Sequence, residues 1–182
     1  LMLARLIGDI GVATFSVLSF IYSLANAVLS GVAQGLQPLW GQCYGRNDKE
    51  EMAWYFRCGL IVDLILAVLI YAALFFFNVP VIRIFNREPA LIAEASVALP
   101  VFALSFIPMA LNLIYTEYFF STKRTGTASA IAVSRGIVLK ALMIFCLPLV
   151  FGAEAIWLAP LVTEVVTLIS TAALGRINSK QT

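Results

Sequence analysis

Histidine is absent from the sequence, and only three cysteines occur along its 182 positions. Without an imidazole, the chain cannot build a histidine-type zinc site, a haem ligand, a Ser-His-Asp triad or a histidine proton relay. Cys43, Cys58 and Cys146 are odd in number and form no CxxC pair, which argues against a disulfide or metal framework. No aspartate-rich DDxxD motif occurs either. We therefore expect neither an enzyme nor a metal site.

Charged residues are also scarce. They make up 12% of the chain, against about 25% in ordinary soluble domains, while 62% of the residues are hydrophobic. The net charge of +2 is too small to indicate a nucleic-acid partner. Residues 10–45 carry no charge over 36 positions, well beyond the roughly 20 residues that cross a membrane. An integral membrane protein, surrounded by lipid, is predicted.

Hydrophobic runs divide the chain into five spans, and "LMLARLIGDIG" before them is typical of the tail of another helix. We predict an all-α, polytopic transmembrane bundle that forms a single lobe over residues 1–182, with spans at 11–45, 53–78, 95–122, 127–151 and 155–175. The 35-residue first span would be some 50 Å long if straight. It must therefore tilt, bend or protrude, and Pro38 is the expected bend.

The connecting segments predict the orientation. Alternate connections and their flanks hold seven basic residues: Arg46, Lys49, Arg57, Lys123, Arg124, Arg176 and Lys180. The opposite side holds Arg83 and Arg87, with Arg5 unassigned. By the positive-inside rule, the basic loops and the C-terminus should be cytoplasmic. The mixed segment 83–94 should lie at the headgroup boundary.

Small and amide residues mark the first span. Gly31 and Gly35 continue a four-residue spacing of small side chains, which favours close packing against another helix. An amide that faces lipid is costly unless it is hydrogen-bonded, so Gln34 and Gln37 should face another helix or a wet cavity. Tryptophans near span ends, by contrast, are typical of an aromatic belt at the membrane surface.

Ionisable residues within spans are functional hypotheses by default, because a charge at mid-bilayer costs about 2.5–3.5 kcal/mol. Lys140 and Glu164 fall at similar depths on either side of a turn, so they could neutralise one another as a structural pair. Arg135 and Lys140 are the candidate residues for structural or gating ion pairs. The alternative is that Glu164 is a coupling-ion or proton site. Asp63 has no cation at its depth, so its carboxylate is protonated, hydrated or hydrogen-bonded; both proton coupling and a structural role stay open.

The segment "ALNLIYTEYFFSTKR" contributes Asn112, Tyr115 and Glu117 as candidate substrate or coupling-ion residues. Glu117 is only six residues from Lys123, which also fits a place near the cytoplasmic interface. Across the connecting turn, Glu117 and Arg135 have the spacing to approach one another.

Four ordered segments carry a resemblance to a known family: "GVAQGLQPLWGQCYGRND", "VIRIFNREPALIAEAS", "YFFSTKRTGTASAIAVSRGIVLK" and "FGAEAIWLAPLVTEVVTLI". Together they resemble the multidrug and toxic compound extrusion (MATE) transporters. The Gly-rich helix running through Gln-Pro into a charged loop, the Ser-Arg-Gly helix and the final helix follow in the same order over residues 11–175.

The resemblance implies one six-helix lobe of a twelve-helix secondary transporter in the plasma membrane, with the N-terminal lobe as its missing partner. It further implies antiport, in which a cationic amphipathic drug leaves as sodium or protons enter. The family's polar or acidic position on the third span falls nearest Asn112, with Glu117 displaced. Two alternatives stay open: a lipid-linked oligosaccharide flippase, which Arg135 and Lys140 facing inward would favour, and a non-transporting membrane scaffold.

Overall fold

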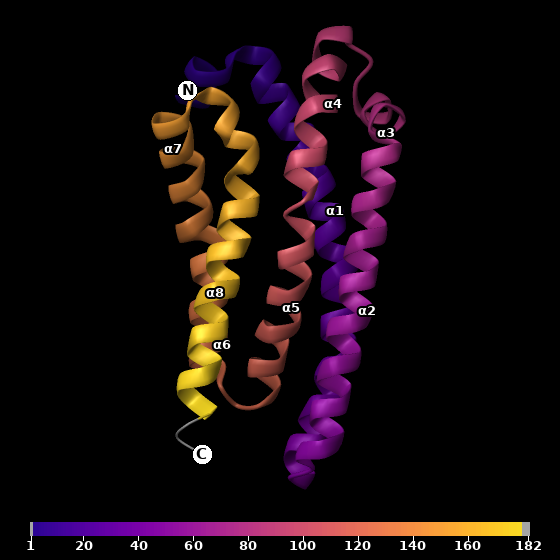
Figure 1. The fold of residues 1–182 in the computed structure, drawn as a ribbon, viewed down its shortest axis with the longest axis vertical. Coiled ribbons are helices and arrows are strands. Elements are labelled where there is room, and N and C mark those ends of the chain that lie inside the picture. Colours follow the sequence, from indigo (N-terminus) through magenta and orange to yellow (C-terminus); the bar gives the residue numbers. More distant parts are fainter. Residues whose placement is uncertain (1, 180–182) are drawn as a thin grey trace.

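The structure, a computed structural model, describes residues 2–179, with side chains for residues 8–172. It is a bundle of long helices packed side by side, and the described residues contain no strand (Figure 1). The prediction of an all-α bundle is confirmed. The segments are α1 (Met2–Arg46), α2 (Lys49–Phe76), α3 (Asn78–Phe85), α4 (Pro89–Ala103), α5 (Phe106–Ser121), α6 (Thr125–Val133), η1 (Ser134–Leu139), α7 (Lys140–Phe151), η2 (Ala153–Leu158) and α8 (Ala159–Ser179).

Helices long and apolar enough to cross a membrane coincide with the five predicted spans. Four are continuous: Gly8–Arg46, Lys49–Phe76, Thr125–Phe151 and Ala153–Ala172. The remaining span is the pair α4 and α5, whose axes differ by 41°. Arg5, Arg176 and Lys180, which the orientation argument used, lie outside the described side chains.

The bend in the third span has a local cause. Proline has no N–H, so Pro108 cannot donate to the carbonyl of Leu104, one turn earlier. That carbonyl accepts instead from the N–H of Ile107 at 3.4 Å, and the chain between α4 and α5 tightens into a turn at Leu104 and Ser105. The result is a broken helix in the middle of the bundle.

The first helix is interrupted at a glycine and not at its proline. Gly8 has φ 69° and ψ −179°, a backbone conformation that glycine adopts at little cost. From there to Arg46 the helix is uninterrupted and passes through Pro38 with helical backbone angles. Pro38 therefore does not interrupt the helix, and a bend there stays a prediction. Its 39 residues span about 58 Å, so α1 tilts or extends beyond the bilayer core.

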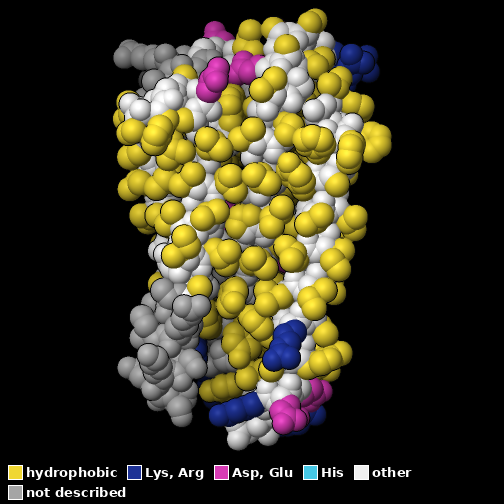
Figure 2. Space-filling view, in the orientation of Figure 1, with side chains coloured by type: hydrophobic (Ala, Val, Ile, Leu, Met, Phe, Trp, Pro, Cys, Tyr) yellow, Lys and Arg dark blue, Asp and Glu magenta, His cyan; other side chains and the backbone are white. Residues whose placement is uncertain are grey.

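Apolar side chains cover the lateral surface, and charged side chains gather toward the two ends (Figure 2). Large hydrophobic side chains on that surface are widely exposed, including Phe76 at 76% and Phe151 at 78%. A soluble domain would rarely leave so large an apolar area open to solvent. Lipid is the surrounding that this belt fits.

The core of the lobe lies where α1, α2 and α5 meet. Trp40 is fully buried there, with its ring 6.3 Å from that of Phe56 and 5.7 Å from that of Tyr118. Trp157 is also buried, whereas Trp54 is 60% exposed. The expected aromatic belt is thus wrong for Trp40 and Trp157, because each indole fills space between helices instead of reaching the membrane surface.

Gly59 is the position where α2 approaches α1 most closely among the described glycines. A Cβ placed there would lie 2.5 Å from Leu36 Cδ1 and 3.4 Å from Ile114 Cδ1. We expect Gly59→Leu to destabilise the protein by about 1–3 kcal/mol, as overpacking does. The matched control is Gly31→Leu, since a Cβ there meets nothing within 4 Å. Denaturant titration of both variants in detergent measures the difference, and equal losses would contradict the packing argument.

Candidate functional site

Glu164 is the centre of a buried polar cluster. Its side chain, on α8, is only 1% exposed. The Tyr22 hydroxyl, on α1, donates to Oε1 at 2.8 Å, and the Asn112 amide, on α5, donates to Oε2 at 2.8 Å. The same amide also donates to the Glu164 carbonyl at 2.9 Å. One carboxylate therefore ties three helices together.

Two cations flank this carboxylate on the span formed by α6, η1 and α7. Arg135 Nη1 lies 3.6 Å from Glu164 Oε2. Lys140 places its ammonium 4.3 Å from the centre of the Tyr22 ring and forms no ion pair within the described side chains. The predicted Lys140–Glu164 pair is therefore wrong. Lys140 projects toward Tyr22 on α1, and Arg135 is the residue that reaches the carboxylate.

A π-helix positions the two cations. Residues Ser134–Leu139 form this segment within an otherwise α-helical span. A π-turn holds more residues than an α-turn, so it rotates the side chains that follow relative to those before it. Arg135 lies inside this turn and Lys140 directly after it, so the directions of the two side chains depend on it. No feature of the local sequence had indicated the π-helix.

Asn112 is fully buried, as its predicted role requires. Its amide nitrogen donates a hydrogen bond to Glu164, but its Oδ1 atom has no hydrogen-bond partner among the described residues. A buried carbonyl oxygen without a donor is costly. This oxygen, beside Glu164, is a ready acceptor for a proton donor or a cation.

Asp63 stands apart from this cluster. It is fully buried on α2, and neither carboxylate oxygen has a partner in the part of the chain that the structure describes. It shares the buried stripe of α2 with Gly59 and Ala67, each four residues away. The expectation that no cation shares its depth stays a prediction.

Tyr115 and Glu117 lie nearer the end of α5. The Tyr115 ring packs 5.2 Å from that of Phe56, and it lines a hollow of about 940 Å³ beside the loops of Lys123 and Arg124. Glu117 is half-buried and forms no ion pair with Arg135. The predicted approach of Glu117 and Arg135 is therefore wrong.

Gln34 and Gln37 are exposed on the surface of the lobe, as are Gly31 and Gly35. A Cβ at either glycine would meet nothing within 4 Å, so the expected close helix packing does not form within the described residues. The glutamines likewise do not face another helix of this lobe. They stay candidates for the lining of a wet cavity.

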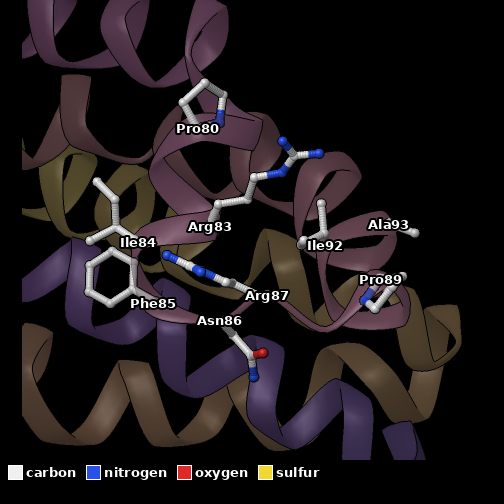
Figure 3. A pocket seen from close by; sticks show the side chains of 9 residues that line it. All are labelled: Pro80, Arg83, Ile84, Phe85, Asn86, Arg87, Pro89, Ile92 and Ala93. Carbon is white, nitrogen blue, oxygen red and sulfur yellow. The ribbon is translucent and has the colours of Figure 1, made fainter.

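A further hollow, of about 1300 Å³, lies between α3 and α4 (Figure 3). Arg83 and Arg87 line it, and their guanidinium groups point in different directions. Nearby, Ile84 is 80% exposed. Exposed apolar and basic side chains together are what the predicted headgroup position of this segment requires. None of the candidate site residues lines this hollow.

Buried carboxylates and cations inside a bundle of apolar, partly broken helices define a polytopic membrane transporter more readily than an anchor. The sequence profile of the MatE family matches residues 1–146. The chain therefore belongs to the MATE family of transporters, and the resemblance found in its sequence is confirmed. No curated protein matches the chain.

Solved structures show the same fold. An outward-facing conformation of a multidrug resistance MATE transporter of the MOP superfamily superposes with a TM-score of 0.88 at 16% identity, and an inward-facing conformation with 0.87 at 16%. A MOP superfamily transporter from Pyrococcus furiosus, described as having a binding pocket of reversed polarity, also gives 0.87 at 16%. Each match covers 97% of this chain but only 40–41% of the other chain. The chain thus spans less than half of their length.

Proposed function

We propose that this chain is one lobe of a secondary transporter in the plasma membrane that couples export to entry of sodium or protons. The observation that carries the proposal is the buried Glu164, held by neutral donors from α1 and α5 and by Arg135 at 3.6 Å. An ion pair of that length is loose. A proton or sodium ion can therefore compete with Arg135 for the carboxylate.

Asp63 supplies a second carboxylate for coupling. With no partner for either oxygen, it stays in the bundle only as the neutral acid or with a bound cation. Both forms make it an exchange site for the driving ion. Glu117, which is half-buried and lies near the loops, is given no coupling role in this proposal.

Alternating access would come from rocking against a second lobe, with the 41° break between α4 and α5 as the deformable element. A cationic amphipathic drug is the substrate that the resemblance implies, whereas the two cations beside Tyr22 favour an anionic group on the transported compound. The similar structures, which are described as multidrug resistance transporters, support a drug-like substrate.

One observation favours a second candidate, the flippase-like transport of an anionic compound. Arg135 and Lys140 both line a small cavity beside Tyr22, as an anion-binding lumen requires. The scaffold alternative is less well supported, because it requires every intramembrane charge to be paired. Asp63 and Lys140 form no ion pair within the described side chains.

The test is ion flux in proteoliposomes, with the protein as it assembles in its own membrane. Under a sodium or proton gradient, we expect Asp63→Asn and Glu164→Gln each to lower substrate-induced ion flux at least about tenfold, because each removes the exchangeable charge. Glu117→Gln, the matched control, should stay within about twofold. If all three variants transport like the wild type, carboxylate coupling is wrong.

A further inference from the structure

We propose that the cavity between α1 and the π-helix binds the anionic group, a carboxylate or phosphate, of the transported compound. The inference rests on the proposed transport function and names the substrate class. The cavity measures about 220 Å³ and is lined by Tyr22, Ser23, Asn26, Arg135, Gly136 and Lys140. Ligand pockets for whole drug-sized molecules are usually larger, about 300–1,000 Å³. This one fits the charged end of a longer molecule.

The charges around the cavity favour an anionic ligand. Arg135 and Lys140 bring two positive charges to the cavity, and the neighbouring Glu164 brings one negative charge. The excess is one positive charge, carried by Lys140. Among the described side chains, its partner is the face of the Tyr22 ring at 4.3 Å. An ammonium at this depth in a membrane calls for a counter-ion, and an anionic ligand supplies it.

The hydrogen-bond donors of the cavity also favour an anionic ligand. Arg135 Nη1 is buried and makes no hydrogen bond to any residue whose side chain is described, although it lies 3.6 Å from Glu164. A guanidinium in this state has donors left for a planar carboxylate or a phosphate. Asn26 and Ser23, from one face of α1, add an amide and a hydroxyl to the same cavity. The Asn26 amide can donate to an anionic oxygen, whereas the Ser23 hydroxyl already donates to the Ser19 carbonyl at 3.0 Å.

The depth of the cavity favours a transported compound over a resident lipid headgroup as its ligand. Lys140 stands between the ends of the Thr125–Phe151 span, 15 residues from one end and 11 from the other. At about 1.5 Å per residue, that is roughly 22 Å and 17 Å from the helix ends. Lipid headgroups lie at those ends, so a headgroup in its usual position does not reach the cavity.

A polar stripe on α1 leads to the cavity. Its members recur every three or four residues and so share one helix face: Ser19, Ser23, Asn26, Ser30, Gln34 and Gln37. From Asn26 to Gln37 it runs about 16 Å toward the end that carries the α1–α2 turn. The stripe contains no charge, so it offers a hydrated track while the cavity selects the sign of the ligand. This gives Gln34 and Gln37 a reason to be exposed.

The test compares two fluorescent amphiphiles with the same dansyl-dodecyl body, one ending in a phosphate monoester and the other in trimethylammonium. Binding to the purified protein in detergent is followed by dansyl fluorescence. We expect the phosphate probe to bind more tightly, and Lys140→Gln to weaken it at least about tenfold. Lys140→Glu should reverse the preference in favour of the ammonium probe. Arg83→Gln, which removes a cation from the hollow in Figure 3, should leave binding within about twofold.

Asn26→Leu is the control for folding, because it keeps every charge and removes only an amide from the cavity. It should weaken binding of the phosphate probe without reversing the preference for phosphate over ammonium. Equal or tighter binding of the ammonium probe to the wild type, or no effect of Lys140→Gln, would overturn the proposal. Nanodiscs containing phosphatidylglycerol separate the sources of the anion. Full competition by that lipid would assign the cavity to a resident headgroup and also overturn it.

Flux measurements keep this inference separate from the proposed function. If ion coupling is intact and the phosphate probe does not bind, the anion site is wrong and the transporter proposal stands. If the probe binds in a Lys140-dependent way but no ion flux accompanies any substrate, coupled transport is wrong and the anion specificity of the cavity stands.

Discussion

Replacing Arg135 by methionine is expected to destabilise the protein by about 3 kcal/mol, because it strips a buried carboxylate of its cation. Glu164 is 1% exposed and Arg135 Nη1 is 3.6 Å from it. Breaking such a pair by removing one partner usually costs about 3–5 kcal/mol. The lower end applies here, since Tyr22 and Asn112 still donate hydrogen bonds to the carboxylate. Denaturant titration in detergent micelles measures the free energy of unfolding.

The double variant Arg135→Met with Glu164→Gln decides whether the loss arises from the pair. A glutamine can keep accepting the hydrogen bond from Tyr22 and carries no charge to neutralise. We therefore expect the double variant to recover most of the stability, as a coupled pair does in a double-mutant cycle. Arg83→Met, at the end of the bundle, is the matched control. If Arg135→Met unfolds like the wild type, the interaction with Glu164 contributes nothing to the fold.

The architecture of the lobe could be predicted from hydropathy alone. Long runs without charge must become helices in lipid, since every backbone group needs a partner there. The breaks were harder to place. Pro108 breaks its span because it has no N–H to donate to the Leu104 carbonyl, which accepts from Ile107 instead. Pro38, by contrast, lies within a regular helix. The decisive break of α1 is at Gly8, which only its positive φ distinguishes from other glycines of that helix.

The candidate site was predicted in part. Glu164, Asn112 and Arg135 were singled out as polar residues within spans, and the structure brings all three together. Their pairing could not be predicted, because depth follows from residue counts but direction depends on helix rotation. The π-helix changes that rotation between Arg135 and Lys140. Tyr22 was missed altogether, since nothing distinguishes it in the sequence from tyrosines that face lipid.

Replacing Trp40 by alanine is the second large effect, with an expected loss of about 3 kcal/mol in unfolding free energy. The indole is fully buried between Phe56 on α2 and Tyr118 on α5, so its removal leaves a cavity where three helices meet. This expected loss lies at the low end of the range for replacing a buried tryptophan by alanine. Lipid, rather than water, surrounds the separated helices, so the lost term is mainly packing. Denaturant titration again gives the measurement.

Trp40→Phe distinguishes packing from hydrogen bonding at this position. The indole Nε1 is buried and has no partner in the described part of the chain, so phenylalanine gives up no hydrogen bond there and removes an unsatisfied donor. We expect it to cost less than half as much as Trp40→Ala. Trp54→Ala, at a side chain that is 60% exposed, should change stability by no more than about 0.5 kcal/mol. A loss in Trp40→Phe as large as in Trp40→Ala would mean that the indole nitrogen has a partner after all, and the α1–α2–α5 junction would then be held by a polar contact rather than by packing.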